Sequence, residues 1–132
     1  MKMRTLLAVL ALLALSLAGS AMAETHTIMQ DGVSWEPSEI TIQVGDTVEW
    51  MWTSLSHTVT NGNGPDDPDA GSMFDETLDS ANPLVSYTFT EAGAVPFFCR
   101  PHFALGMTGV ITVEDGVATE STTWSAVHAL FR

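Results

Sequence analysis

Apolar and polar side chains alternate along three stretches of the chain, residues 39–44, 47–52 and 85–89. A period of two residues is typical of β-strands that bury one face and expose the other. Because Gly45 and Asp46 form a turn signal between the first two stretches, we expect these strands to be antiparallel neighbours in one sheet. The apolar positions expected to face the core are Ile40, Ile42, Val44, Val48, Trp50, Trp52, Val85, Tyr87 and Phe89.

Four further short stretches complete the predicted set of strands, and they are residues 26–30, 57–60, 95–99 and 109–113. Residues 61–82 are rich in Gly, Pro and Asp and lack a sustained apolar period. We expect a long irregular region there, with one short helical turn near Met73 and Phe74. About seven short strands separated by turn signals, with nearly no helix, indicate an all-β sandwich.

The two ends of the chain differ from this central region. Residues 1–23 combine a basic start, an apolar run and an Ala-Met-Ala end, which is the pattern of a secretory signal peptide. The apolar run is too short to be a comfortable membrane span, which needs about 20 apolar residues. We expect cleavage after Ala23, a single domain over residues 24–113 and a C-terminal extension over residues 114–132. Within the extension, residues 124–131 favour a short helix.

Removal of the signal peptide would leave a very acidic protein. All 16 acidic residues follow residue 23, and only Arg100 and Arg132 remain as cations, so the net charge becomes −14. This charge argues against nucleic acid and anionic membranes as partners. It fits equally a basic protein partner or adaptation to high salt. Six acids fall in the irregular region, and they are Asp66, Asp67, Asp69, Asp75, Glu76 and Asp79.

The only cysteine begins a Cys-x-x-His-x-x-x-x-Met motif formed by Cys99, His102 and Met107. The motif lies directly before the predicted strand 109–113, so a tight loop between two strands can place its three side chains around one point. His57, at the start of an earlier strand, can supply a second imidazole. Two histidines, a cysteine and a weak axial methionine are the ligands of a mononuclear electron-transfer copper site.

Each of these residues has an ordinary explanation when it is taken alone. Cys99 and Met107 would be buried core residues, and His57 would be a histidine at a strand end. Their joint pattern is what indicates a metal site. Zinc fits less well than copper because a thioether is a poor fourth ligand for a structural zinc ion.

The same residues resemble a known family. The sequence CRPHFALGM at residues 99–107, followed by GVITV at residues 109–113, resembles the copper loop of cupredoxins of the plastocyanin, pseudoazurin and halocyanin type. Upstream, WEPSEITIQVGDTVEW at residues 35–50 is similar to the second and third strands of these proteins. The resemblance covers roughly residues 26–113.

This resemblance implies a Greek-key β-sandwich that holds one type 1 (blue) copper ion and cycles it between Cu(I) and Cu(II). The ligands that it implies are His57, Cys99, His102 and Met107. The chain departs from the family at Thr58, where an asparagine often ties the two ligand loops together. It also departs at Phe98, where plant plastocyanins have a tyrosine.

The implied function is that of an exported, soluble, monomeric carrier of single electrons, without enzymatic activity, in the periplasm or another extracytoplasmic compartment. Its partners would be redox proteins, such as a basic c-type cytochrome or a membrane or periplasmic oxidoreductase. His102, in an apolar loop, would be the electron port, and Arg100 would tune the potential or orient the partner.

The alternative is a protein that delivers or stores copper. Such a protein should be richer in exposed Met or His, and only His26 and His128 are spare histidines. Multicopper enzymes need more histidines than the four of this chain. Cleavage after Ala23 would also expose Glu24, Thr25 and His26, whose free amine, two backbone amides and third-position histidine could chelate Cu(II) in a square plane. His26 is also explained as the start of a strand.

Overall fold

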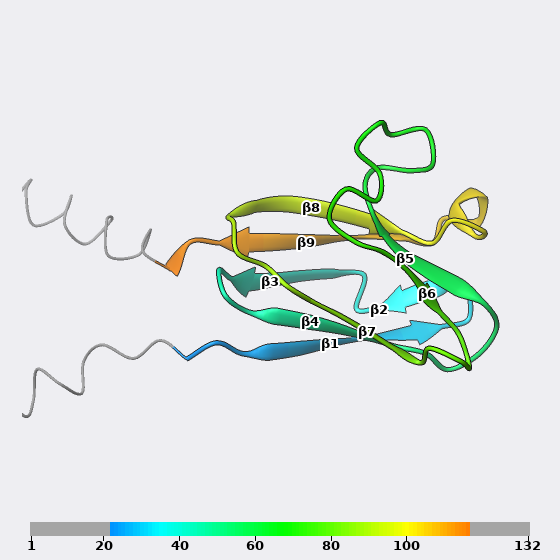
Figure 1. The fold of residues 1–132 in the computed structure, drawn as a ribbon, viewed down its shortest axis with the longest axis horizontal. Helices are drawn as coiled ribbons and strands as arrows, with labels where there is room; N and C mark the ends of the chain where they lie inside the picture. The colour runs from blue at the N-terminus through cyan, green and yellow to red at the C-terminus, as the bar shows by residue number, and fades with distance from the viewer. Residues whose placement is uncertain (1–21, 117–132) are drawn as a thin grey trace, which may run out of the picture.

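Two mixed β-sheets packed face to face make up residues 22–116, the part of the chain that the computed structural model describes (Figure 1). The first sheet has the order β2-β1-β4-β7, formed by Ser34–Glu36, Thr25–Asp31, Thr47–Met51 and Leu84–Thr88. The second has the order β3-β9-β8-β5-β6, formed by Glu39–Gln43, Thr108–Glu114, Gly93–Phe98, His57–Asn61 and Asp75–Leu78. The predicted all-β sandwich is confirmed, and β2 and β6 add two strands to the seven expected.

Two sequence predictions fall largely outside the described residues. They are the signal peptide, of which only residues 22 and 23 are described, and the short helix at residues 124–131. The proposed limits of the domain therefore stay a prediction, although the strands themselves run from Thr25 to Glu114. Between residues 22 and 116, no helix is long and apolar enough to cross a membrane.

The pairing expected for the first two alternating stretches is wrong, because β3 and β4 belong to different sheets. β3 runs parallel to β9, with Ile40 opposite Ile111, whereas β4 runs parallel to β1. At Gly45 (φ 95°) the chain turns a corner between the sheets, and the Gly45 N–H donates to Phe89 O (2.7 Å). Alternation reveals which face of a strand is buried but not which strand lies beside it. Val44, at this corner, is accordingly 38% exposed.

The helical turn expected near Met73 and Phe74 is also wrong. The side-chain Oδ1 of Asn61 accepts the backbone N–H groups of both Met73 (2.8 Å) and Phe74 (3.0 Å). This amide holds the segment beside β5, and the short edge strand β6 begins at the next residue, Asp75. The Phe74 side chain is buried in the core.

Aromatic rings fill the core between the sheets at the level of β8. Phe97 meets Trp35 and Trp50 edge to face, with ring centroids 5.6 Å from each. Gly109 lies opposite Phe97 in the β8–β9 pair, and a Cβ atom there would collide with the Phe97 ring and with the carbonyl oxygen of Ser38. This close approach fixes the end of β8 immediately before Cys99.

The segments that carry the predicted site meet at one end of the sandwich (Figure 1). β5 begins there at His57, β8 ends there at Phe98, and β9 leaves from there at Thr108. A single turn of 3-10 helix, η1 (Phe103–Leu105), lies in the loop between β8 and β9. The loops at this end therefore determine the geometry of the site.

Candidate metal centre

Three of the predicted ligands lie within direct contact of one another. Cys99 Sγ lies 3.6 Å from His57 Nδ1 and 3.4 Å from His102 Nδ1, and the two nitrogens are 3.2 Å apart. Three donors in one plane around a single ion, at metal distances of about 2.0–2.3 Å, are separated by roughly 3.5 Å. The triangle therefore has the size that one metal ion requires, although its members lie 42 and 3 residues apart in the chain.

The hydrogen bonding of His57 fixes which ring nitrogen faces this triangle. His57 Nε2 lies 2.9 Å from the carbonyl oxygen of Ser54, so this nitrogen carries the proton and donates. Nδ1 is then the unprotonated nitrogen, and its lone pair points toward Cys99 and His102. Burial lowers the pKa of His57 and favours the neutral form that binds metals.

Cys99 is buried and belongs to no disulfide. Burial raises the pKa of its thiol, and this effect outweighs the backbone N–H groups of Thr58 and His102, which lower the pKa of the sulfur. A metal ion takes the place of the thiol proton when it binds, since the thiolate is the ligand. The N–H groups are already in place to stabilise the charged sulfur.

Met107 closes the loop that follows Cys99. Its carbonyl oxygen accepts the Cys99 N–H (3.1 Å), and its own N–H donates to His102 O (3.3 Å). Gly106 takes the left-handed conformation (φ 84°) that lets the chain turn back at this point. The Met107 side chain is fully buried.

Sequence reasoning missed the residue that holds the loop before His57. Gln30 is fully buried, and its Oε1 accepts the N–H groups of Thr53 (2.7 Å) and Ser54 (2.8 Å). Ser54 in turn presents its carbonyl to His57. The one available signal was position, because Gln30 follows buried Ile28 by two residues and so occupies an inward-facing place in β1.

Thr58 ties the two ligand segments together in spite of the departure noted in the sequence. Its Oγ1 accepts the backbone N–H of Arg100, at 2.9 Å. The Arg100 guanidinium binds both carboxylate oxygens of Asp75, at 3.1 and 2.9 Å. This pair lowers the pKa of Asp75 and raises that of Arg100. Arg100 is therefore not a free cation at the surface.

The site opens to solvent on one side only. His57, Cys99 and Met107 are buried, whereas His102 is partly exposed. Leu105 in the same loop is 67% exposed, so an apolar surface lies beside the partly exposed imidazole.

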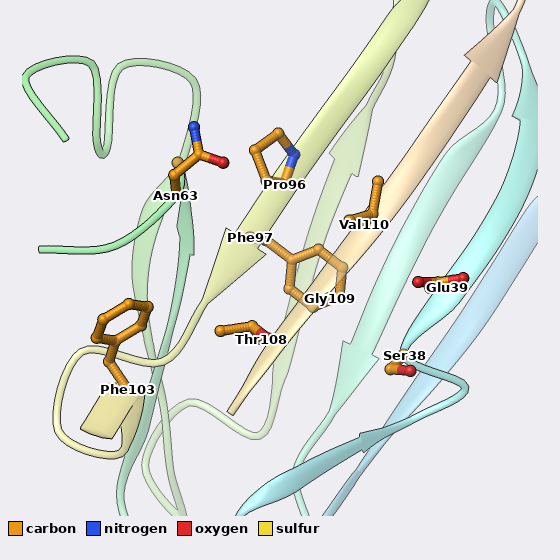
Figure 2. A pocket seen from close by; sticks show the side chains of 10 residues that line it. Ser38, Glu39, Asn63, Pro96, Phe97, Phe103, Thr108, Gly109 and Val110 are labelled. Carbon is orange, nitrogen blue, oxygen red and sulfur yellow. The ribbon is translucent and has the colours of Figure 1, made fainter. Parts of the chain in front are cut away.

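An open groove on the outer face of β8 and β9 is separate from the donor atoms. Its volume is about 450 Å³, and Phe103 and Asn63 lie at one end of it (Figure 2). None of the four predicted ligands lines this groove. This groove therefore lies apart from the donor cluster.

The second copper site predicted at Glu24, Thr25 and His26 needs a free amine at Glu24, and it stays a prediction. Asp46 Oδ1 accepts the backbone N–H of Glu24 (2.9 Å), and Asp46 Oδ2 pairs with His26 Nε2 (2.9 Å). His26 also lies in β1, paired with Val48 of β4. Asp46 thus holds the Glu24 N–H and the His26 ring side by side at the start of β1.

Comparison with known proteins gives consistent matches over this region. The sequence model described as copper binding proteins, plastocyanin/azurin family, matches residues 22–114. Halocyanin of Natronomonas pharaonis is 31% identical over 87 residues, 64% of this chain and 50% of its own length, so the chain spans half of that relative. Plastocyanin of Scenedesmus fuscus is 33% identical over 84 residues, 61% of this chain and 86% of its own. The crystal structure of amicyanin from Paracoccus versutus superposes with a TM-score of 0.55 at 29% identity, covering 74% of this chain and 86% of that one.

Proposed function

The chain belongs to the plastocyanin/azurin family of copper-binding proteins, and on that premise we propose that it carries single electrons between redox proteins. We assign His57, Cys99 and His102 as the strong ligands of one type 1 copper ion and Met107 as its weak axial ligand. The observation that carries this proposal is the triangle of three donor atoms, with the lone pair of His57 directed inward by Ser54. Copper, when bound, supplies a one-electron couple between Cu(I) and Cu(II).

The surrounding protein supplies rigidity. His57, Cys99 and Met107 are buried, and each is held by hydrogen bonds outside the metal triangle. Ligands that are fixed before the metal arrives need little rearrangement when the metal changes its oxidation state. Rapid electron exchange follows from such a site without any substrate pocket.

His102 is the proposed electron port. It is the ligand that reaches toward solvent, and exposed Leu105 follows it by three residues. A partner that covers this small apolar face would bring its own redox centre close to the His102 ring. Leu55, 61% exposed on the loop that precedes His57, enlarges the apolar surface at this end of the sandwich.

The loop between β5 and β6 (residues 62–74), called the acidic loop because it carries Asp66, Asp67 and Asp69, lies beside the proposed port. Gly64 packs so closely on Phe103 that a Cβ atom there would lie 2.7 Å from the Phe103 ring. Asp66 and Asp67 line the hollow that this contact leaves. These charges favour a basic redox protein, such as a c-type cytochrome, over an acidic partner. The predicted signal peptide places the encounter outside the cytoplasm.

A one-electron titration tests the carrier function against copper delivery. We expect the copper-loaded protein to accept one electron per chain from a reductant, to return it to a basic c-type cytochrome, and to retain its copper throughout. Release of the ion to a Cu(I) chelator upon reduction, without electron transfer to the cytochrome, would contradict the proposal and support delivery. A Cys99→Ser variant given the same copper is the matched control.

A further inference from the structure

A closed ring of side chains joins the strand that carries His57 to the residue that follows Cys99. The Thr58 and Thr60 hydroxyls lie 3.0 Å apart, and Thr60 Oγ1 lies 2.8 Å from Asp75 Oδ1. Asp75 binds the Arg100 guanidinium, and the Arg100 backbone N–H returns to Thr58. β5, β6 and the ligand loop thus meet in one network.

The direction of each hydrogen bond in this ring follows from donor and acceptor accounting. An ionised carboxylate only accepts, so Thr60 must donate its single proton to Asp75. Thr60 then has only lone pairs left for Thr58, and the Thr58 hydroxyl must donate to Thr60. The Thr58 oxygen is left as the acceptor that the Arg100 N–H requires. The carboxylate of Asp75 therefore orients the Thr58 hydroxyl, which it does not touch, through the Thr60 hydroxyl.

The ring acts on the sulfur through Thr58. Thr58 directly follows His57, and its hydroxyl holds the backbone N–H of Arg100, which directly follows Cys99. The surroundings of the cysteine sulfur are one of the factors that set the potential of a blue copper site. Any shift of Thr58 relative to Arg100 would therefore change the environment of the metal–thiolate bond.

The ring is built as a structural unit rather than a pair of surface charges. Thr60 is fully buried. The Arg100 guanidinium lies 5.7 Å from the centre of the Phe98 ring, which is also buried. The Asp75 and Arg100 side chains themselves are 41% and 37% exposed, so their Coulomb attraction alone contributes little to stability. The Asp75–Arg100 pair instead fixes the geometry of the ring.

We propose that Asp75, through Thr60, Thr58 and Arg100, is a positioning residue for the copper centre and helps to set its reduction potential. This inference rests on the proposed function and deepens it. It develops the expectation that Arg100 tunes the potential, since the guanidinium is engaged by Asp75 and acts through the ring.

The decisive variant changes no charge. Thr60→Val keeps the volume of the buried side chain and removes the hydroxyl that links Thr58 to Asp75. We expect it to shift the reduction potential of the copper-loaded protein and to alter the thiolate-to-copper absorption. In the copper-free protein, the Arg100 amide should exchange with solvent about five- to ten-fold faster, which corresponds to the loss of one hydrogen bond. Thr60→Ser retains the hydroxyl and should keep all three properties close to those of the wild type.

A second variant approaches the ring from its exposed side, where misfolding is not a concern. Asp75→Asn should change the potential and the Arg100 amide exchange in the way that Thr60→Val does, beyond the effect of removing one charge. Glu76→Gln measures that charge effect, because Glu76 is an exposed residue of the same strand. Potentials in Thr60→Val and Asp75→Asn that match those of Glu76→Gln, together with unchanged Arg100 exchange, would overturn the proposal. The exchange measurement needs no copper, so it remains decisive even if the carrier function fails.

Discussion

The side-chain amide of Gln30 binds Ser54 with both of its ends. Its Oε1 accepts the Ser54 N–H at 2.8 Å, and its Nε2 lies 3.4 Å from Ser54 Oγ. The Ser54 carbonyl then receives the Nε2–H of His57. A buried residue of β1 thus orients a metal ligand at the start of β5 without touching it.

Replacement of Gln30 should therefore damage both stability and the site. In Gln30→Leu the N–H groups of Thr53 and Ser54 lose their acceptor, and we expect a loss of about 1–3 kcal/mol in the free energy of unfolding. Chemical denaturation of the copper-free protein measures this. Gln43→Leu, at an exposed glutamine of β3, is the control. Equal losses of unfolding free energy in the two variants would show that the buried amide of Gln30 stabilises the fold no more than an exposed one.

Gly109 should not tolerate even a methyl group. The added Cβ would collide with the Phe97 ring and the Ser38 carbonyl, and such overpacking costs about 1–3 kcal/mol. We expect Gly109→Ala to lower the midpoint of thermal unfolding. In Gly116→Ala the new Cβ would meet only Gln43 Oε1, at 3.5 Å, so this control should be close to neutral. A Gly109→Ala protein as stable as the control would refute the close packing of β8 on β9.

Asp46 should make the fold sensitive to acid. The backbone N–H of Glu24 is the main cause of the lowered pKa of Asp46, and the N–H of Gln43 and the ring of His26 add to it. A carboxylate with a lowered pKa stabilises the fold fully above its unfolded value of about 3.9, and this stabilisation is lost as the pH falls through the lower folded value.

The test compares the wild type with Asp46→Asn from pH 7 down to pH 2. The difference between their unfolding midpoints should be largest near neutral pH and should shrink below about pH 4. Asp66→Asn, at an exposed residue of the acidic loop, should show no such convergence. A difference that stays constant at every pH would contradict the lowered pKa of Asp46.

The acidic loop should influence the rate of encounter with a basic partner. Raising the salt from about 10 to 150 mM shortens the Debye length from about 30 to 8 Å, so a rate that depends on steering should fall. We expect Asp66→Asn/Asp69→Asn to slow electron transfer at low salt and to weaken this dependence. Glu24→Gln/Glu91→Gln, at the opposite end of the sandwich, should do neither. Electron-transfer rates that do not change with salt concentration would contradict steering and favour salt adaptation as the reason for the acidity.

Local sequence patterns predicted that Cys99 and His102 would lie together, because their chemistry is specific and their spacing is short. The two residues are three positions apart, and the loop after β8 brings their donor atoms to 3.4 Å. The partners of β3 and β4 could not be predicted in the same way, because alternation is the same in a hairpin and in a corner between sheets. Gln30 escaped notice because a polar residue at an inward position is identified only when its buried hydrogen bonds are seen.

The visible absorption spectrum after addition of Cu(II) tests the central claim most directly. If Cys99 is a strong ligand beside His57 and His102, the protein should turn intensely blue, with a band at about 600 nm from the thiolate–copper bond. The band should be absent in Cys99→Ser. A wild-type protein that binds Cu(II) but stays colourless would contradict the proposed site, since Cys99 would then not be bonded to the metal.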